Sequence, residues 1–182
     1  MKKQGRWLDI SSTLSQSKEQ INEHITFTHP TKSDGKHMYT LAKDSKVLDV
    51  NSPYSYVMWS TYFQQTSMIV TYKDERIGFI SGYILPEQPD TLFIWQVAVS
   101  EKFRGFGLAT RMINALYDSL KSKGIHFIEA TVTPSNKPSS NLFKGVANKY
   151  NTQCKTTLCF SKADFPIADT EEEYTYRIGP IQ

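Results

Sequence analysis

The residues that decide the fold are Thr91-Leu92-Phe93-Ile94-Trp95-Gln96-Val97-Ala98-Val99 and, shortly after them, Arg104-Gly105-Phe106-Gly107-Leu108-Ala109. The first stretch is a nearly continuous apolar run, which is typical of a strand covered on both faces. The second is a short loop with two glycines that opens an amphipathic helix, which we expect to stop at Lys123-Gly124. Backbone N–H groups of such a loop and of the helix N-terminus can bind a pyrophosphate, because glycine leaves the backbone accessible. The segment therefore predicts a phosphate-binding strand–loop–helix unit, with Arg104 adding positive charge at its rim.

The spacing of the glycines separates the classes of phosphate-binding loop. A dinucleotide-binding fingerprint needs G-x-G-x-x-G, and its third glycine is absent. A P-loop needs Gly-Lys-Ser/Thr, which is absent too. The pattern present is Gln/Arg-x-x-Gly-x-Gly/Ala, which Arg104, Gly107 and Ala109 satisfy. Taken alone, so short a pattern also fits an ordinary glycine turn between a strand and a helix.

Working outward, helical and extended patterns alternate along the chain. Before the central segment, Ser33-Asp34 and Ser52-Pro53 are typical helix starts, and a polar turn at 73–76 joins two strands. The remaining expected elements are strands at 25–28, 68–72, 77–85, 125–132, 155–160 and 174–178 and a helix at 139–150. The order predicts a mixed α/β fold, with hairpins first and a βαβα unit later.

Composition places the chain among ordinary globular proteins. It has 182 residues, of which 39% are hydrophobic and 21% charged, so we expect one compact domain. The net charge of +3 is too small to indicate nucleic-acid binding. Residues 1–23 are rich in Ser, Gln and Lys, and we expect a flexible tail there, with the domain at 24–182. Without a signal-type apolar segment or a bilayer-length run, we expect a cytoplasmic protein that does not contact membranes.

The two cysteines are Cys154 and Cys159. We expect both as buried thiols on a late strand, because free cysteine is commonly buried. Five extended residues span about 16 Å, which makes a disulfide between them awkward. Their spacing does not suit a metal site, so no metal is expected, and nothing near them suggests a nucleophile.

The central unit resembles the acetyl-CoA pyrophosphate motif of the GNAT superfamily. The next loop carries Asn136, where GNAT proteins often place a residue that contacts the pantetheine arm, and Leu142-Phe143 follow at the usual offset. The resemblance implies a central mixed, mostly antiparallel sheet flanked by helices, with acetyl-CoA as co-substrate. The strand of Val97 and Val99 would splay from that of Thr131, and a main-chain N–H near Val97 would stabilise the tetrahedral oxyanion. The cofactor-binding residues so implied are Val97, Ala98, Val99, Arg104, Gly105, Phe106, Gly107, Leu108, Ala109, Thr131, Asn136, Ser140 and Phe143.

A closer resemblance is to the family of L-2,4-diaminobutyrate acetyltransferases, which make an intermediate of ectoine. It rests on four segments, at 48–54, 89–99, 131–136 and 176–180. It runs from about Phe27 to Pro180. It implies acetylation of the 4-amino group of diaminobutyrate, giving the N4-acetyl product, and a homodimer. Other small-amine GNAT enzymes, for polyamines or aminoglycosides, and a CoA-binding sensor without turnover remain alternatives.

The same resemblance implies the substrate-binding residues. Asp49 would hold an ammonium group, with the Tyr54 hydroxyl beside it, and Trp95 would shape the pocket. Glu173 is a further candidate, and Glu129 is an alternative acidic contact or base, ranked below Asp49. Each also has a structural interpretation: Asp49 could cap a turn, the two aromatic residues could belong to the core, and Glu173 could be a solvated charge.

The expected reaction is direct attack of the amine on the thioester, with Val97 and Tyr54 as the candidate catalytic residues. Many GNAT enzymes protonate the leaving thiolate with a tyrosine seven residues after the motif asparagine. Here that position is Phe143. The general acid is therefore open, and Tyr54 and an ordered water are the candidates.

Overall fold

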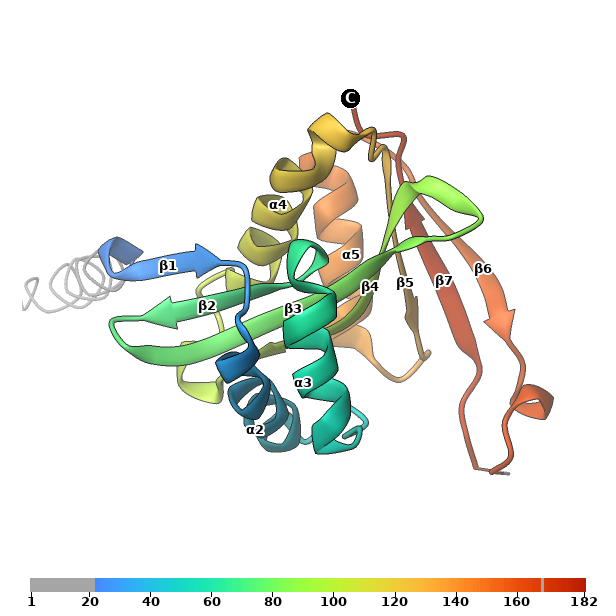
Figure 1. Ribbon diagram of the computed structural model, residues 1–182. Helices are drawn as coiled ribbons and strands as arrows, with labels where there is room; N and C mark the ends of the chain where they lie inside the picture. The colour runs from blue at the N-terminus through green and yellow to red at the C-terminus, as the bar shows by residue number, and fades with distance from the viewer. Residues whose placement is uncertain (1–21, 168) are drawn as a thin grey trace, which may run out of the picture.

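The computed structural model describes residues 22–167 and 169–182 and shows one seven-stranded sheet between two pairs of helices (Figure 1). The strands are β1 Ile25–Thr28, β2 Met68–Tyr72, β3 Glu75–Leu85, β4 Gln88–Val99, β5 Phe127–Val132, β6 Cys154–Phe160 and β7 Glu173–Ile178. The helices are α2 Gly35–Ser45, α3 Pro53–Tyr62, α4 Leu108–Leu120 and α5 Lys137–Lys149. The expected tail at 1–23 lies, apart from its last two residues, outside the described residues.

The sheet has the order β1-β2-β3-β4-β5-β7-β6. The pairing of β4 with β5 is parallel, and the other pairings are antiparallel. The connection from β4 to β5 contains α4, as a parallel pair requires a crossover. The prediction of a mixed, mostly antiparallel sheet flanked by helices is therefore confirmed.

The two faces of the sheet bury two separate cores. On one face α4 and α5 cover the larger core, where Leu92 on β4 and Met112 and Leu116 on α4 are fully buried. On the other face α2 and α3 cover β2 to β4, with Met38 and Tyr56 against the sheet (Figure 1). Each large apolar side chain buried in this way contributes about 1.5–3 kcal/mol. The packing holds β4 rigidly between two helical layers.

The helix starts follow from local sequence. Ser52 caps α3, because its side chain accepts a hydrogen bond from the N–H of Ser55, and Pro53 occupies the first turn. Asn136 caps α5 in the same way, its Oδ1 accepting from the N–H of Ser139 at 3.1 Å. With Pro138 in its first turn, α5 begins at Lys137, earlier than the expected Ser139.

Three expectations about the strands were wrong in detail. Trp95 is 47% exposed, so β4 is not covered on both faces along its whole length. β4 begins at Gln88, three residues before the start of the apolar run at Thr91. Cys159 is exposed and Cys154 only partly buried, because both lie on β6, an edge strand with one neighbour in the sheet. Both are free thiols, and partial burial raises the pKa of Cys154.

Candidate active site

The site begins where β4 and β5 part. The two strands pair only over Thr91–Phe93 with Phe127–Glu129, while β4 continues to Val99 and β5 to Val132. The facing edges beyond this pairing leave backbone N–H and C=O groups that an extended ligand can bind. The expected splay of the two strands is therefore present.

A cavity of about 440 Å³ opens at this splay. Its wall is formed by the end of β4, the loop and first turns of α5, and the C-terminus of α2 with the residues after it. Six of the predicted cofactor residues line it, namely Val97, Ala98, Val99, Arg104, Ala109 and Asn136. The other lining residues were not predicted as cofactor contacts; they are Ser45, Val47, Leu48, Ser135, Pro138, Ser139 and Leu142.

The glycine loop borders this cavity and a second hollow of about 290 Å³, which Arg104, Gly105, Gly107 and Ala109 help to line. Gly105 and Gly107 have φ of 82° and 68°, a conformation that side chains with a Cβ rarely adopt. A Cβ at either position would meet no protein atom within 4 Å, so the space before the loop is open. No side chain caps α4 at Gly107, and the helix dipole favours an anion there. These residues fit a pyrophosphate.

Several predicted cofactor residues lie behind the cavity wall. Ser140 is buried and accepts a hydrogen bond of 3.0 Å from the Tyr176 hydroxyl, and Phe143 is only 3% exposed and packs against the Tyr176 ring. Because of the helical period, Ser139 and Leu142 face the cavity instead. Leu108, which also lines the second hollow, and Phe106 anchor the loop to the core, where the Phe106 ring lies 6.3 Å from that of Phe103.

Acidic side chains converge near Glu173, at the start of β7. Its Oε2 atom is buried and has no hydrogen-bond partner among the described residues. Burial raises the pKa of the Glu173 carboxyl, the Thr131 hydroxyl lowers it, and the charges of Asp49 and Glu171 raise it further. The predicted residues Asp49, Thr131 and Glu173 are thus brought into one electrostatic environment. A buried carboxylate oxygen without a hydrogen-bond partner is costly and suits a cationic ligand.

The Asp49 segment is tied directly to β4. The side-chain amide of Gln96, only 7% exposed, donates a hydrogen bond of 2.8 Å to the Asp49 carbonyl oxygen. Gln96 precedes Val97, so one residue connects the acidic segment to the strand that lines the cavity. This role of Gln96 was not predicted. The signal that could have indicated it is a polar side chain inside an apolar run.

Glu129 lies in a different environment. It is 8% exposed and forms an ion pair with Arg177, which also donates to Gln88 Oε1 at 2.7 Å and Thr91 Oγ1 at 3.3 Å. The guanidinium lies 3.9 Å from the centre of the Phe127 ring. The structure thus gives Glu129 a partner that joins β4, β5 and β7.

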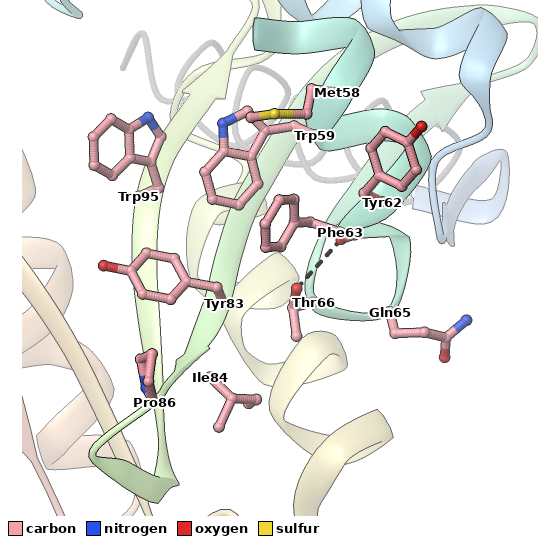
Figure 2. Close-up of a pocket in the computed structure, with 10 residues that line it drawn as sticks. All are labelled: Met58, Trp59, Tyr62, Phe63, Gln65, Thr66, Tyr83, Ile84, Pro86 and Trp95. Carbon is pink, nitrogen blue, oxygen red and sulfur yellow. Dashed lines mark hydrogen bonds between the residues drawn. The ribbon is translucent and has the colours of Figure 1, made fainter.

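The predicted aromatic residues are exposed. Tyr54, in the first turn of α3, is 73% exposed. Trp95 stacks on Trp59 with ring centroids 6.1 Å apart. Figure 2 shows both tryptophans in a groove of about 540 Å³ on the α3 side, with Tyr62 and Tyr83 nearby. The structure thus places Tyr54 and Trp95 outside the 440 Å³ cavity, on a face that is open in the single chain.

Two further observations concern the described residues. No group of three His, Cys, Asp or Glu side chains among them is arranged to hold a metal ion. None of the helices in this part of the chain combines the length and apolar character needed to cross a bilayer.

Comparisons with known proteins agree with this geometry. The model of the Acetyltransferase (GNAT) family matches residues 35–146. L-2,4-diaminobutyric acid acetyltransferase of Shouchella clausii is 46% identical over 158 residues, 87% of this chain and 88% of that protein. The enzyme of the same name from Oceanobacillus iheyensis is 48% identical over 160 residues, 86% of this chain and 88% of that protein.

A solved structure gives the same result. The diaminobutyrate acetyltransferase of Paenibacillus lautus, in complex with L-2,4-diaminobutyric acid and coenzyme A, superposes with a TM-score of 0.82 at 36% identity. The match covers 87% of this chain and 96% of that one. The chain therefore belongs to the GNAT acetyltransferases and, among them, to the family of L-2,4-diaminobutyric acid acetyltransferases.

Proposed function

We propose that the protein transfers the acetyl group of acetyl-CoA to the 4-amino group of L-2,4-diaminobutyrate, giving N4-acetyl-L-2,4-diaminobutyrate for ectoine synthesis. The observation that carries this proposal is the open glycine loop at the mouth of the strand splay, together with the Glu173 Oε2 atom, which is buried and has no hydrogen-bond partner among the described residues. The first suits a CoA pyrophosphate and the second suits an ammonium group. The Paenibacillus lautus relative binds both kinds of ligand.

Substrate recognition rests on charge. Diaminobutyrate carries two amino groups that are largely protonated at neutral pH, so the site must offer negative charge for them. Asp49 and Glu173 provide it, and each carboxylate acts on the other electrostatically. An ammonium between them would relieve both the repulsion and the lost hydration of Glu173.

The reaction is direct transfer. The 4-ammonium group loses one proton, and its nitrogen attacks the thioester carbon and then loses a second proton. The carbon–sulfur bond breaks as the thiolate leaves and takes up a proton, so that one proton is released in total. Glu173 is our candidate base, because its raised pKa makes it a better proton acceptor than an exposed carboxylate. The main-chain N–H of Val97 would stabilise the oxyanion. Tyr54 is the candidate donor to the thiolate in place of the tyrosine that Phe143 replaces.

We further propose that residues 24–182 form one catalytic domain, which works in the cytoplasm as a homodimer. Support for the dimer comes from the two predicted substrate residues that one chain leaves open, Tyr54 at 73% and Trp95 at 47% exposure. A second copy would shield them from water.

The test is release of the CoA thiol from acetyl-CoA with a panel of amines: diaminobutyrate, ornithine, lysine, spermidine and an aminoglycoside. We expect rapid release with diaminobutyrate alone, and NMR of the product should place the acetyl group on the 4-amino nitrogen. Rapid release with a different amine would keep the chemistry and reject the substrate. If no amine in the panel causes release of the CoA thiol while acetyl-CoA still binds, the protein would be a CoA-binding sensor without turnover.

A further inference from the structure

The acidic run Glu171-Glu172-Glu173 divides into three carboxylates with three different environments. Glu171 accepts hydrogen bonds from Ser135, Glu172 accepts one of 3.0 Å from the Tyr174 hydroxyl, and Glu173, which is bound by the Thr131 hydroxyl, keeps one buried oxygen without a partner among the described residues. Neighbouring residues of the same chemical type are therefore not interchangeable. Of the two residues that precede Glu173, Glu171 is the one whose contact leaves its own segment.

Ser135 binds Glu171 at two points. Its backbone N–H donates to Glu171 Oε2 at 3.1 Å, and its hydroxyl donates to Oε1. Hydrogen bonds to an ionised acceptor are stronger than neutral ones, and two of them fix a direction as well as a distance. Ser135 lies in the loop between β5 and α5 and lines the 440 Å³ cavity. Glu171 is thus held against the wall of the candidate CoA cavity.

Glu171 lies two residues before Glu173, in the connection from β6 to β7. The other hydrogen bonds of the described residues in this connection are local, such as those between Ser161 and Asp164. Glu173 itself is paired with Phe160 on β6 and bound by the Thr131 hydroxyl, and the contact with Ser135 adds a fixed point two residues before it, where the chain enters β7. Without it, the connection would have more conformations available, and Glu173 would have to be ordered by the substrate.

We propose that Glu171 is a positioning residue for the amine substrate: its two-point contact with Ser135, here called the Ser135–Glu171 latch, holds Glu173 in place. The proposal rests on the proposed function of Glu173 in binding the substrate ammonium. Because Ser135 also lines the CoA cavity, the latch joins the walls of the two substrate sites. The chemical class of ligand that depends on it is a primary ammonium.

Steady-state kinetics with a matched control tests the latch. Glu171→Gln removes the charge and the acceptor for one of the two Ser135 donors, while Glu172→Gln removes the same charge from a carboxylate that is hydrogen-bonded by its neighbour Tyr174. We expect Glu171→Gln to raise the KM for diaminobutyrate about tenfold, the range for one charged hydrogen bond. Its kcat and its KM for acetyl-CoA should stay within about twofold of those of the native enzyme. Glu172→Gln should leave all three nearly unchanged.

The Ser135 side gives an independent check. Ser135→Ala should raise the same KM, Ser135→Thr should restore it, and the double variant Ser135→Ala/Glu171→Gln should be less than additive, as expected for residues in contact. Equal effects of Glu171→Gln and Glu172→Gln would overturn the latch and show that general charge is responsible.

A second measurement separates the latch from the proposed function. Hydrogen exchange of the Ser135 amide, followed by NMR, should accelerate in Glu171→Gln and not in Glu172→Gln, whatever the substrate. If this acceleration is seen while diaminobutyrate is not turned over by the native enzyme, the latch exists and the proposed substrate is wrong. If the Ser135 amide exchanges equally fast in all variants, the latch is rejected even when the enzyme is active.

Discussion

Asp49 and Glu173 are far apart in the sequence, and their carboxylates differ in burial. Asp49 is exposed and lies on a segment held by Gln96, whereas Glu173 has a buried oxygen with no hydrogen-bond partner in the part of the chain that the structure describes. An exposed carboxylate keeps most of its hydration and costs little to the fold. The buried one is kept at a cost in stability, as is common at functional sites.

Replacing Asp49 should therefore affect the substrate and not the fold. We expect Asp49→Ala to lower kcat/KM for diaminobutyrate by at least about tenfold, because a charge contact to the ammonium is lost. Affinity for acetyl-CoA, measured by isothermal titration, should stay nearly intact, since Gln96 binds the Asp49 backbone and not its side chain. Native kinetics in Asp49→Ala would make Asp49 a structural residue.

Replacing Glu173 should stabilise the fold and lower the activity. Its folded-state pKa is raised, so the folded protein binds the proton more tightly than the unfolded chain, and the ionised form destabilises the fold at neutral pH. We expect Glu173→Gln to raise the free energy of unfolding at pH 7, a gain that disappears as the pH falls through the raised pKa and the native residue becomes protonated. The same substitution, Glu173→Gln, should sharply lower the turnover of diaminobutyrate.

Urea denaturation at pH 7 and at acid pH, paired with kinetics, checks this prediction. Glu172→Gln is the control, because that carboxylate is bound by a tyrosine hydroxyl. If Glu173→Gln loses stability at pH 7, the carboxylate stabilises the fold and is not held ready for a ligand.

The helix starts and the strand that local sequence patterns determine could be predicted from the sequence. The starts of α3 and α4 follow from Ser52-Pro53 and from Gly107, and the apolar run marks β4. The splay of β4 from β5 came from the family resemblance. Contacts between distant segments, such as that of Gln96 with Asp49, could not be predicted, because side-chain pairing across a fold leaves no periodic signal in the sequence.

The positions of Ser140, Phe143 and Glu129 have the same explanation. The offsets that suggest Ser140 and Phe143 as cofactor contacts do not show which face of α5 meets the cavity. The packing of Tyr176 against α5 directs both residues to the core and leaves Leu142 at the surface of the cavity. For Glu129, the missing information was its partner Arg177 on β7, a strand that comes much later in the chain.

The glycine loop allows a prediction about the β4–α4 unit with an internal control. Gly107 and Gly124 have φ of 68° and 83°, and a Cβ at either would meet no protein atom within 4 Å. Gly107→Ala and Gly124→Ala should therefore lose similar stability, about 1 kcal/mol each. Only Gly107→Ala should also raise the KM for acetyl-CoA, since its methyl group enters the space proposed for the pyrophosphate. Thermal denaturation and kinetics on both variants separate strain from ligand contact; equal acetyl-CoA KM values would place the pyrophosphate elsewhere.

For the whole molecule, the two faces of the sheet differ in what covers them. α4 and α5 close one face, whereas α2 and α3 cover only the β2 to β4 part of the other (Figure 1). The aromatic groove of Figure 2 lies beside α3, at the border of that cover. Large exposed aromatic side chains in contiguous groups are typical of surfaces that bind a partner.

The proposed homodimer is tested by mass and by activity together. Light scattering should give twice the chain mass of 20.8 kDa. Tyr62, 78% exposed in the groove, should tolerate a charge without loss of the fold but not within an interface. We therefore expect Tyr62→Glu to give folded monomers with a raised KM for diaminobutyrate, because Trp95 in the same groove would be left open to water. Ile167→Glu, at a residue 67% exposed outside the groove, is the control and should remain dimeric. A native protein that runs as an active monomer would show that one chain completes the site and that the groove has another use.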